Sequence, residues 1–258
     1  MAAQGEAGVR VERRGAVLIV TIDRPRVRNA IHGAAAWAIA AAMDALDDDP
    51  ALFLGIITGA GGWFSAGADI SPAAQATRHP LSPRGHFGLC RRPPAKPLIA
   101  AIEGLALGGG LEIALACDLI VASRGARMGL PEVRHGLVAL GGGAFRLPRR
   151  LPYHLAAELL LTGEPRDAEF FFGHGLVNRL VEPGEALDEA GRLAELLLAN
   201  GPLALAASAR ILRSAQDWSD EEAWLRQEIL VEPLRTSEDR AEGLRAFAEK
   251  RRPIWRGR

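Results

Sequence analysis

The sequence predicts an α/β core followed by a helical C-terminal region. Short apolar runs rich in β-branched residues suit buried strands. A glycine run leads from one of these runs directly into an apolar helix, which is the pattern of a parallel sheet with crossover connections. From Pro152 onward, helical segments dominate. With 258 residues, the chain is long enough to bury the core of one large domain.

Four strands are predicted in the first half of the chain, at residues 16–22, 53–58, 98–102 and 119–122. Between the first two lies an alanine-rich stretch, residues 29–46, in which Ile31, Ile39 and Met43 recur at near-helical spacing, so a helix is expected there. Residues 71–97 contain six prolines and are predicted to form a mobile surface loop.

The remaining predicted elements are helices. One follows the glycines 108–110 at residues 111–117, just before the fourth strand. The others span residues 155–162, 186–199 and 202–214, and a charged helical region covers residues 220–251. Trp224, Leu225 and Ile229 are apolar positions within this charged region, so the core alone would leave them uncovered.

The composition excludes several classes of function. Thirty-one basic and 31 acidic residues cancel, so nothing draws the chain generally toward nucleic acid or an anionic membrane. Two isolated cysteines, Cys90 and Cys117, form neither a disulfide framework nor a metal-ligand pattern, and no metal is expected. Residues 1–15 do not resemble a signal peptide, and a cytoplasmic location is expected.

Two glutamates stand just downstream of glycine-rich stretches. Glu112 falls in the first turn of the helix opened by glycines 108–110, and Glu132 follows Gly129 and a proline. Free N–H groups at a helix start bind an oxyanion, while a nearby carboxylate moves protons. The alternative is structural: the glycines pack a helix against a strand, Glu112 is a helix N-terminal charge and Glu132 is a surface loop acid. If the two side chains meet, their titrations couple.

A third element precedes these two. In residues 64–70, Gly67 lies among small residues after a strand, which suggests a turn that exposes the N–H of Ala68. A plain strand-to-helix turn is the alternative. Ser65 lacks the G-x-S-x-G context of a hydrolase nucleophile. His135 is a candidate proton shuttle or an exposed loop histidine.

At these residues the chain resembles the crotonase (enoyl-CoA hydratase/isomerase) superfamily over nearly its whole length. The segments that carry the resemblance are Ile22-Asp23-Arg24-Pro25 with Asn29-Ala30, Phe64-Ser65-Ala66-Gly67-Ala68-Asp69-Ile70, the stretch from Lys96 through Gly108-Gly109-Gly110-Leu111-Glu112 to Asp118, Gly175-Leu176-Val177-Asn178-Arg179-Leu180-Val181, and Ala246-Phe247-Ala248-Glu249-Lys250-Arg251. The resemblance implies a crotonase-like ββα spiral core at residues 1–199 and a helical oligomerisation region at residues 200–258. It further implies a homotrimer or a pair of trimers.

The resemblance also implies an activity, the hydration of an enoyl-CoA thioester. The backbone N–H groups of Ala68 and Gly109 would form the oxyanion hole. Glu112 would activate water for attack at Cβ, and Glu132 would deliver a proton to Cα. Coenzyme A is part of the substrate, so no separate cofactor is expected. The residues that would contact the CoA or acyl parts are Arg26, Ala66, Asp69, Ile70, Phe247 and Lys250.

The sequence departs from the common hydratase pattern near the acyl and CoA pockets. Residues 136–145 lack the proline and the Thr-Gln pair of many hydratases, Ser71 replaces a common lysine, and Arg28 replaces a common leucine. Residues 138–145 look closer to the crotonobetainyl-CoA hydratase (carnitine-racemase-like) branch. The alternatives are therefore that reaction, an enoyl-CoA isomerisation, or a non-catalytic relative that binds acyl-CoA or RNA. Isomerases commonly keep only the acid matching Glu132, so Glu112 favours hydration.

Overall fold

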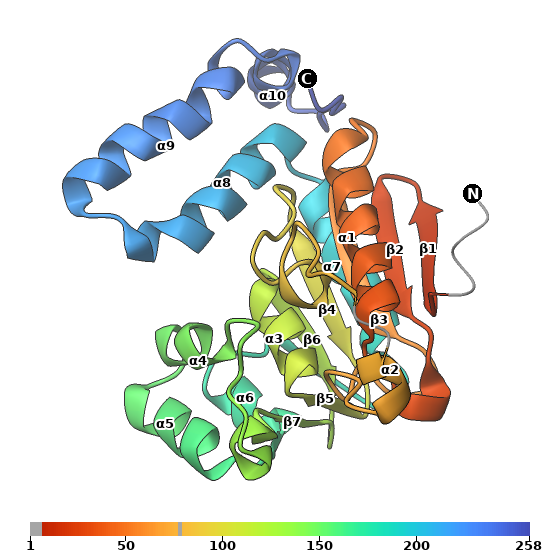
Figure 1. Ribbon diagram of the computed structural model, residues 1–258. Helices are drawn as coiled ribbons and strands as arrows, with labels where there is room; N and C mark the ends of the chain where they lie inside the picture. Colours follow the sequence, from red (N-terminus) through yellow and green to blue (C-terminus); the bar gives the residue numbers. More distant parts are fainter. Residues whose placement is uncertain (1–6, 77–78) are drawn as a thin grey trace.

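A six-stranded sheet forms the framework of the protein (Figure 1). The computed structural model describes residues 7–76 and 79–258. Residues 1–6, the start of the segment that we expect not to be a signal peptide, lie outside the described part. The strands run in the order β1 (Val9–Arg14), β2 (Val17–Ile22), β3 (Leu54–Gly59), β4 (Leu98–Ile102), β6 (Leu119–Ser123) and β9 (Arg179–Val181). The β1–β2 pair is antiparallel, and the other pairs are parallel.

Helices cover both faces of this sheet, which explains why its strands are apolar throughout. On β2, Val20 packs in the cluster that includes residues of α1 (Gly33–Asp48). The next residue back, Ile19, packs in the other cluster, with residues of α7 (Ala186–Leu198). Because alternate side chains of a strand face opposite sides, a sheet covered on both faces needs an unbroken apolar run. The predicted α/β core is confirmed.

A second, three-stranded sheet connects the core to the region of the candidate site. It contains β5 (Leu105–Leu107), β7 (Arg127–Gly129) and β8 (Arg166–Asp167). Helix α3 (Gly109–Ala116) follows β5 directly and leads back to β6. All eight residues of α3 are buried. The smaller helices nearby are η3 (Pro131–His135), α4 (Gly143–Arg146), η4 (Leu147–Arg149), α5 (Tyr153–Thr162) and α6 (Ala168–Gly173).

The four predicted strands are present with shifts of one residue at most at each end, but five strands were not predicted. Strand β1 alternates apolar and charged residues in an exposed edge, and β5, β7, β8 and β9 are two or three residues long. Such short strands are defined by their pairing partners and carry little periodicity of their own. The predicted helix at residues 29–46 starts later, at Gly33, because Asn29 has a left-handed backbone (φ 57°).

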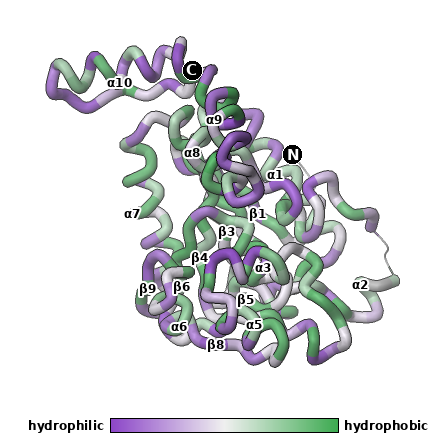
Figure 2. The backbone as a smooth tube through the Cα atoms, turned by 90° about the vertical axis from the view of Figure 1, so that its left-hand side faces the viewer, coloured by the Kyte–Doolittle hydropathy of each residue, from purple (hydrophilic) through white to green (hydrophobic). Residues whose placement is uncertain are grey.

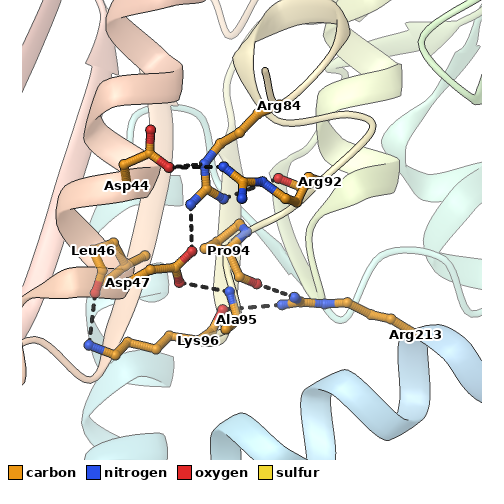
Figure 3. Close-up of polar contacts among 9 residues, drawn as sticks. All are labelled: Asp44, Leu46, Asp47, Arg84, Arg92, Pro94, Ala95, Lys96 and Arg213. Carbon is orange, nitrogen blue, oxygen red and sulfur yellow. Dashed lines mark hydrogen bonds and ion pairs between the residues drawn. The ribbon is translucent and has the colours of Figure 1, made fainter. Parts of the chain in front are cut away.

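The predicted surface loop at residues 71–97 is partly wrong. It contains α2 (Pro72–Ala76) and η2 (His86–Gly88), and its second half is anchored on α1 (Figure 3). Arg84 is 2% exposed and forms ion pairs with Asp44 (2.7 Å) and Asp47 (2.5 Å). Lys96 donates to two carbonyl groups at the end of α1, at 2.8 and 2.7 Å. The prolines predicted a loop correctly, but the ion pairs of the buried Arg84 that hold this loop depend on residues distant in the sequence.

The C-terminal helices extend from one end of the sheet body (Figures 1 and 2). They are α8 (Pro202–Ser214), the short η5 (Ala215–Asp217), α9 (Asp220–Arg235) and α10 (Glu238–Glu249). Arg213 joins α8 to the core through an ion pair with Asp118 and a bond to the carbonyl of Pro94. The predicted helical region 220–251 is two helices, separated where Ser237 caps α10. A domain boundary after residue 199 stays a prediction.

Large apolar side chains remain exposed on these helices in the single chain. Trp224, Leu225 and Ile229 of α9 are 70%, 64% and 72% exposed, and Phe247 of α10 is 86% exposed. Within the described residues, no single helix is long and apolar enough to cross a membrane. One bent pair, Ala186–Leu198 with Pro202–Asp217, meets the length and composition criteria only jointly.

Candidate active site

The first oxyanion segment lies beside the start of α3. The N–H of Ser65 donates to the carbonyl of Leu105 at 3.0 Å, and the N–H of Leu107 donates back to the carbonyl of Ser65 at 3.0 Å. Residues 65–67 therefore run parallel to β5 toward the helix. A Cβ on Gly67 would lie 2.9 Å from the backbone nitrogen of Gly109, and Gly67 has a φ of +93°. Glycine is required at this position by both space and backbone conformation.

The N–H groups of Ala68 and Gly109 are unoccupied donors. The bonds on either side of Ala68, from Asp69 to Ile31 and from Ile31 to Gly67, turn the N–H of Ala68 away from Ile31. Gly109 is the first residue of α3, where backbone donors have no partner in the helix. Neither N–H has a hydrogen-bond acceptor among residues 7–76 and 79–258. Two free donors placed this close suit a carbonyl oxygen that gains negative charge.

Glu112 is buried and held by backbone donors. Its side chain is 2% exposed, and its Oε1 accepts a hydrogen bond from the N–H of Gly143 at 2.8 Å. Burial, together with the nearby charge of Glu132, raises the pKa of this carboxyl to about 7 against the opposing hydrogen bonds from Gly143 and Gly141. A carboxyl with a pKa near neutrality exchanges protons readily at physiological pH.

Glu132 also lies beside the start of α3. It sits in η3 (Pro131–His135), and its Oε1 lies so near Gly108 that a Cβ there would be 3.0 Å away. Its Oε2 is buried without a hydrogen-bond partner in the described part of the chain. Burial raises the pKa of Glu132. An unpartnered buried carboxylate oxygen is energetically costly, so a water or substrate group is expected to bind to it.

The structure thus brings together four of the predicted residues: Ala68, Gly109, Glu112 and Glu132. The structural alternatives for the two glutamates are not favoured, since Glu112 is buried and one carboxylate oxygen of the half-buried Glu132 is buried without a partner among the described residues. Ser65 donates its hydroxyl proton to the carbonyl of Asn29 at 2.8 Å, which is a structural role. His135 is exposed.

Phe87 also belongs to this site, and the sequence did not single it out. Its ring lies against Gly109, where a Cβ would be 2.2 Å from Cζ, and against Gly141, where a Cβ would be 3.1 Å from Cε2. Phe87 has a left-handed backbone, with φ of 55° and ψ of 17°, which a bulky residue adopts only under constraint. The ring occupies space between an oxyanion donor and the loop that holds Glu112. The only feature of the sequence that could have indicated this role is an aromatic residue between Gly85 and Gly88 in a proline-rich segment.

The predicted CoA and acyl contacts near the first segment have different surroundings. Asp69 forms an ion pair with Arg24 at 3.0 Å, so its carboxylate fixes the segment that carries Ala68. The N–H of Ala66 donates to the carbonyl of Arg28 at 2.9 Å. Arg26 and Ile70 are exposed.

The C-terminal contacts lie elsewhere. Phe247 and Lys250 are exposed at the end of α10. Figure 1 shows α10 at the top of the molecule and β5 near the bottom. A single chain does not bring them to the site at the start of α3.

The chain matches known proteins over almost its whole length. The enoyl-CoA hydratase/isomerase family matches at residues 12–258. Enoyl-CoA hydratase EchA19 of Mycobacterium tuberculosis is 41% identical over 255 residues, covering 96% of this chain and 96% of that protein. Carnitinyl-CoA dehydratase of Salmonella arizonae is 42% identical over 257 residues, covering 96% of this chain and 98% of that protein. The crystal structure of enoyl-CoA hydratase EchA1 from Mycobacterium marinum superposes with a TM-score of 0.94 at 50% identity, covering 98% of this chain and 100% of that one.

Proposed function

This chain belongs to the enoyl-CoA hydratase/isomerase family, and from that premise we propose that it adds water across the 2,3-double bond of an enoyl-CoA thioester. The observation that carries the proposal is the buried Glu112 and the half-buried Glu132, whose Oε2 is buried, beside two backbone donors that have no acceptor among the described residues. The chemistry is that of a hydro-lyase. No metal or separate cofactor is invoked, because the two carboxyl groups and the backbone supply the proton transfers and the charge stabilisation.

The thioester carbonyl binds between the N–H groups of Ala68 and Gly109. When a nucleophile adds at Cβ, electrons move through the conjugated system and negative charge accumulates on the thioester oxygen. The two donors stabilise that enolate-like charge, and removing one such donor typically costs about 3 kcal/mol of barrier. Because Gly109 starts α3, the helix dipole adds to this stabilisation.

The glutamates act on one water molecule. Glu112, ionised above a pKa of about 7, accepts a proton from the water as it attacks Cβ. Glu132, whose pKa is also raised by burial, delivers a proton to Cα. Its unpartnered Oε2 is the oxygen that faces this chemistry. The charge of Glu132 also raises the pKa of Glu112, so the two carboxyl groups are close enough to interact.

Binding of the CoA portion requires a second chain. Arg26, Ala66, Asp69 and Ile70 lie on the chain that carries the catalytic pair, whereas Phe247 and Lys250 reach the site from a neighbouring subunit of a homotrimer or a pair of trimers. The exposed apolar side chains of α9 and α10 support this assembly, because a single chain leaves them in water. We place the protein in the cytoplasm.

Crotonobetainyl-CoA hydration is the second candidate. The sequence identity to carnitinyl-CoA dehydratase, 42%, supports this candidate, because it is as high as the 41% identity to EchA19. Both reactions add water to a conjugated CoA thioester and use the same catalytic groups. They differ in the acyl substituent, which meets the region of Phe87 and residues 138–145. An isomerase or an RNA-binding relative is disfavoured, since both glutamates are retained and the net charge is zero.

The test is a substrate panel. Purified protein is assayed with crotonyl-CoA, longer 2-enoyl-CoAs and crotonobetainyl-CoA by the loss of absorbance of the conjugated thioester. Hydration of at least one simple enoyl-CoA, with saturation, supports the proposal. The double variant Glu112→Gln/Glu132→Gln is the control for background activity. No hydration of any substrate by the folded, assembled wild type would overturn the proposal.

A further inference from the structure

A half-buried arginine, Arg146, connects two segments that pack around Glu112. It is the last residue of α4, which packs against α3 (Figure 1). Its Nη1 donates to the carbonyl of Gly141 at 3.1 Å, and its Nη2 donates to the carbonyl of Cys90 at 2.6 Å. Within residues 7–76 and 79–258, Arg146 forms no ion pair with a carboxylate. Two backbone carbonyls therefore orient a guanidinium whose charge is not neutralised by a partner of its own.

The first of these segments is the glycine loop, residues 141–143, which encloses the carboxyl of Glu112. The N–H of Gly143 donates to Oε1 at 2.8 Å. A Cβ on Gly141 would lie 2.7 Å from Oε2, and a Cβ on Gly143 would lie 3.1 Å from Cγ. Gly142, between them, has a φ of +103°, and a Cβ there would overlap Nη1 of Arg146. The loop can approach both the carboxyl and the guanidinium this closely because it is built from glycine.

The second segment carries Phe87. Cys90 lies two residues after η2, which also packs against α3, and the N–H of Cys90 donates to the carbonyl of His86 at 3.1 Å. The ring of Phe87 lies against Gly141 of the glycine loop. Because one guanidinium binds Cys90 and Gly141 together, it fixes the Phe87 segment and the glycine loop relative to each other. A change at Arg146 therefore affects both sides of the Glu112 carboxyl.

The charge of Arg146 also acts on Glu112. In the described part of the chain, the titratable groups that interact with this carboxyl are Glu132 of η3, Arg146 of α4 and the thiol of Cys90. Burial raises the pKa of Glu112 and the charge of Glu132 adds to that rise, whereas the glycine loop and Arg146 oppose it. Burial raises the pKa of Cys90, so this thiol stays neutral. Arg146 is the positive charge among these groups, and it favours the ionised carboxylate.

We propose that Arg146 is a positioning residue for the hydration, which holds the glycine loop and the Phe87 segment around the carboxyl of Glu112. It acts through Glu112 and not on the substrate. The inference rests on the proposed function, because it takes Glu112 as the base. Arginine suits this role because its planar guanidinium presents separate donors to two carbonyls, whereas the ammonium of lysine is a compact point charge.

The first experiment compares the pH dependence of kcat/KM for the best enoyl-CoA substrate of the panel in the wild type, Arg146→Gln and Arg146→Lys. Glutamine removes the charge and the paired donors, while lysine keeps the charge alone. The matched control is Arg149→Gln, which removes the same charge three residues further along. Arg149 is exposed and pairs with Asp217 instead of the glycine loop. Circular dichroism and native mass spectrometry check the fold and assembly of each variant.

In Arg146→Gln the acid limb of the profile should move to higher pH by about half a unit or more, because ionised Glu112 loses its positive neighbour. In Arg146→Lys the limb should stay closer to that of the wild type, while kcat/KM falls by about tenfold because the loop is no longer held. Arg149→Gln should match the wild type. The inference is overturned if the limbs of Arg146→Gln and Arg149→Gln coincide. If Arg146→Gln does not fold, a wild-type kcat/KM in Arg146→Lys overturns it.

The second experiment does not use activity. Glu112→Gln is introduced into the wild type and into Arg146→Gln, and the change in the urea midpoint is measured at about pH 8.5 and about pH 5. The gain from Glu112→Gln should be larger in the Arg146→Gln background at the higher pH, where Glu112 is ionised, and equal in both backgrounds at the lower pH. A gain that is no larger at the higher pH overturns the inference even if the protein is a hydratase. A larger gain in a protein that hydrates no substrate would instead contradict the proposed function.

Discussion

Replacing Glu112 by glutamine should stabilise the protein at alkaline pH while it removes catalysis. The folded state raises the pKa of this buried carboxyl from 4.5 to about 7. Below pH 4.5 the group is neutral in both the folded and the unfolded chain, and its ionisation costs nothing. Between pH 4.5 and about 7 the unfolded chain has lost this proton while the folded chain still holds it, so the free energy of unfolding falls as the pH rises. The loss is complete once the pH has passed the folded pKa.

The magnitude follows from that shift. One pKa unit corresponds to about 1.4 kcal/mol, so ionised Glu112 lowers the free energy of unfolding by roughly 3 kcal/mol at pH values well above 7. Glutamine removes this cost and still accepts the N–H of Gly143, but its NH₂ group would face the N–H of Gly141. Losing that second bond costs about 1 kcal/mol. We expect a net gain of about 2 kcal/mol near pH 8.5 and almost none near pH 5.

The assay is urea unfolding of wild type and Glu112→Gln, followed by tryptophan fluorescence at one fixed protein concentration because assembly contributes to stability. The same samples are assayed for hydration, where kcat should fall by about 10²-fold or more. A destabilisation of equal size at both pH values would refute the reasoning about the buried charge. Unchanged activity would refute the role of Glu112 as the base.

Three further predictions concern other parts of the site. Gly109→Val places a Cβ against the ring of Phe87 and beside the oxyanion donor. We therefore expect kcat/KM to fall by about 10²-fold while the circular dichroism spectrum stays unchanged. An unaltered kcat/KM would place the oxyanion hole elsewhere. Phe87→Ala removes the ring between Gly109 and Gly141. The ratio of kcat/KM for a long or branched enoyl-CoA to kcat/KM for crotonyl-CoA should therefore rise by about tenfold. A constant ratio would show that the ring does not limit the size of the acyl group. Lys250→Ala should raise the KM of the CoA thioester with little change in kcat, and less so for a dephospho-CoA substrate, because a point charge on the 3′-phosphate is lost; equal KM values would exclude that contact.

The local sequence predicted the part of the site that is built from the backbone. Gly67 and the glycines 108–110 indicated where the chain turns tightly and where a helix starts with free donors, and Glu112 follows in the first turn. These features depend on residues close together in the chain. The position of Glu132 relative to Glu112 does not, because it arises when η3 packs beside Gly108.

Phe87 and Arg84 show why the remainder escaped prediction. Both lie in a proline-rich segment that lacks periodicity, and each is fixed by partners far along the chain: Arg84 by Asp44 and Asp47, and Phe87 by contact with Gly109 and Gly141. A sequence reports such contacts only through the fold. The strands β5 and β7 were missed for the same reason, since three residues gain their extended form from their neighbours in the sheet.

A double-mutant cycle on Glu112 and Glu132 tests the central claim most directly. Wild type, Glu112→Gln, Glu132→Gln and the double variant are compared by kcat for crotonyl-CoA hydration. If both carboxyls act on one water molecule, each single change should lower kcat by about 10²-fold or more, and the double variant should be little slower than either single variant. The account is contradicted if either single variant keeps nearly the wild-type kcat, or if the two losses multiply as independent effects.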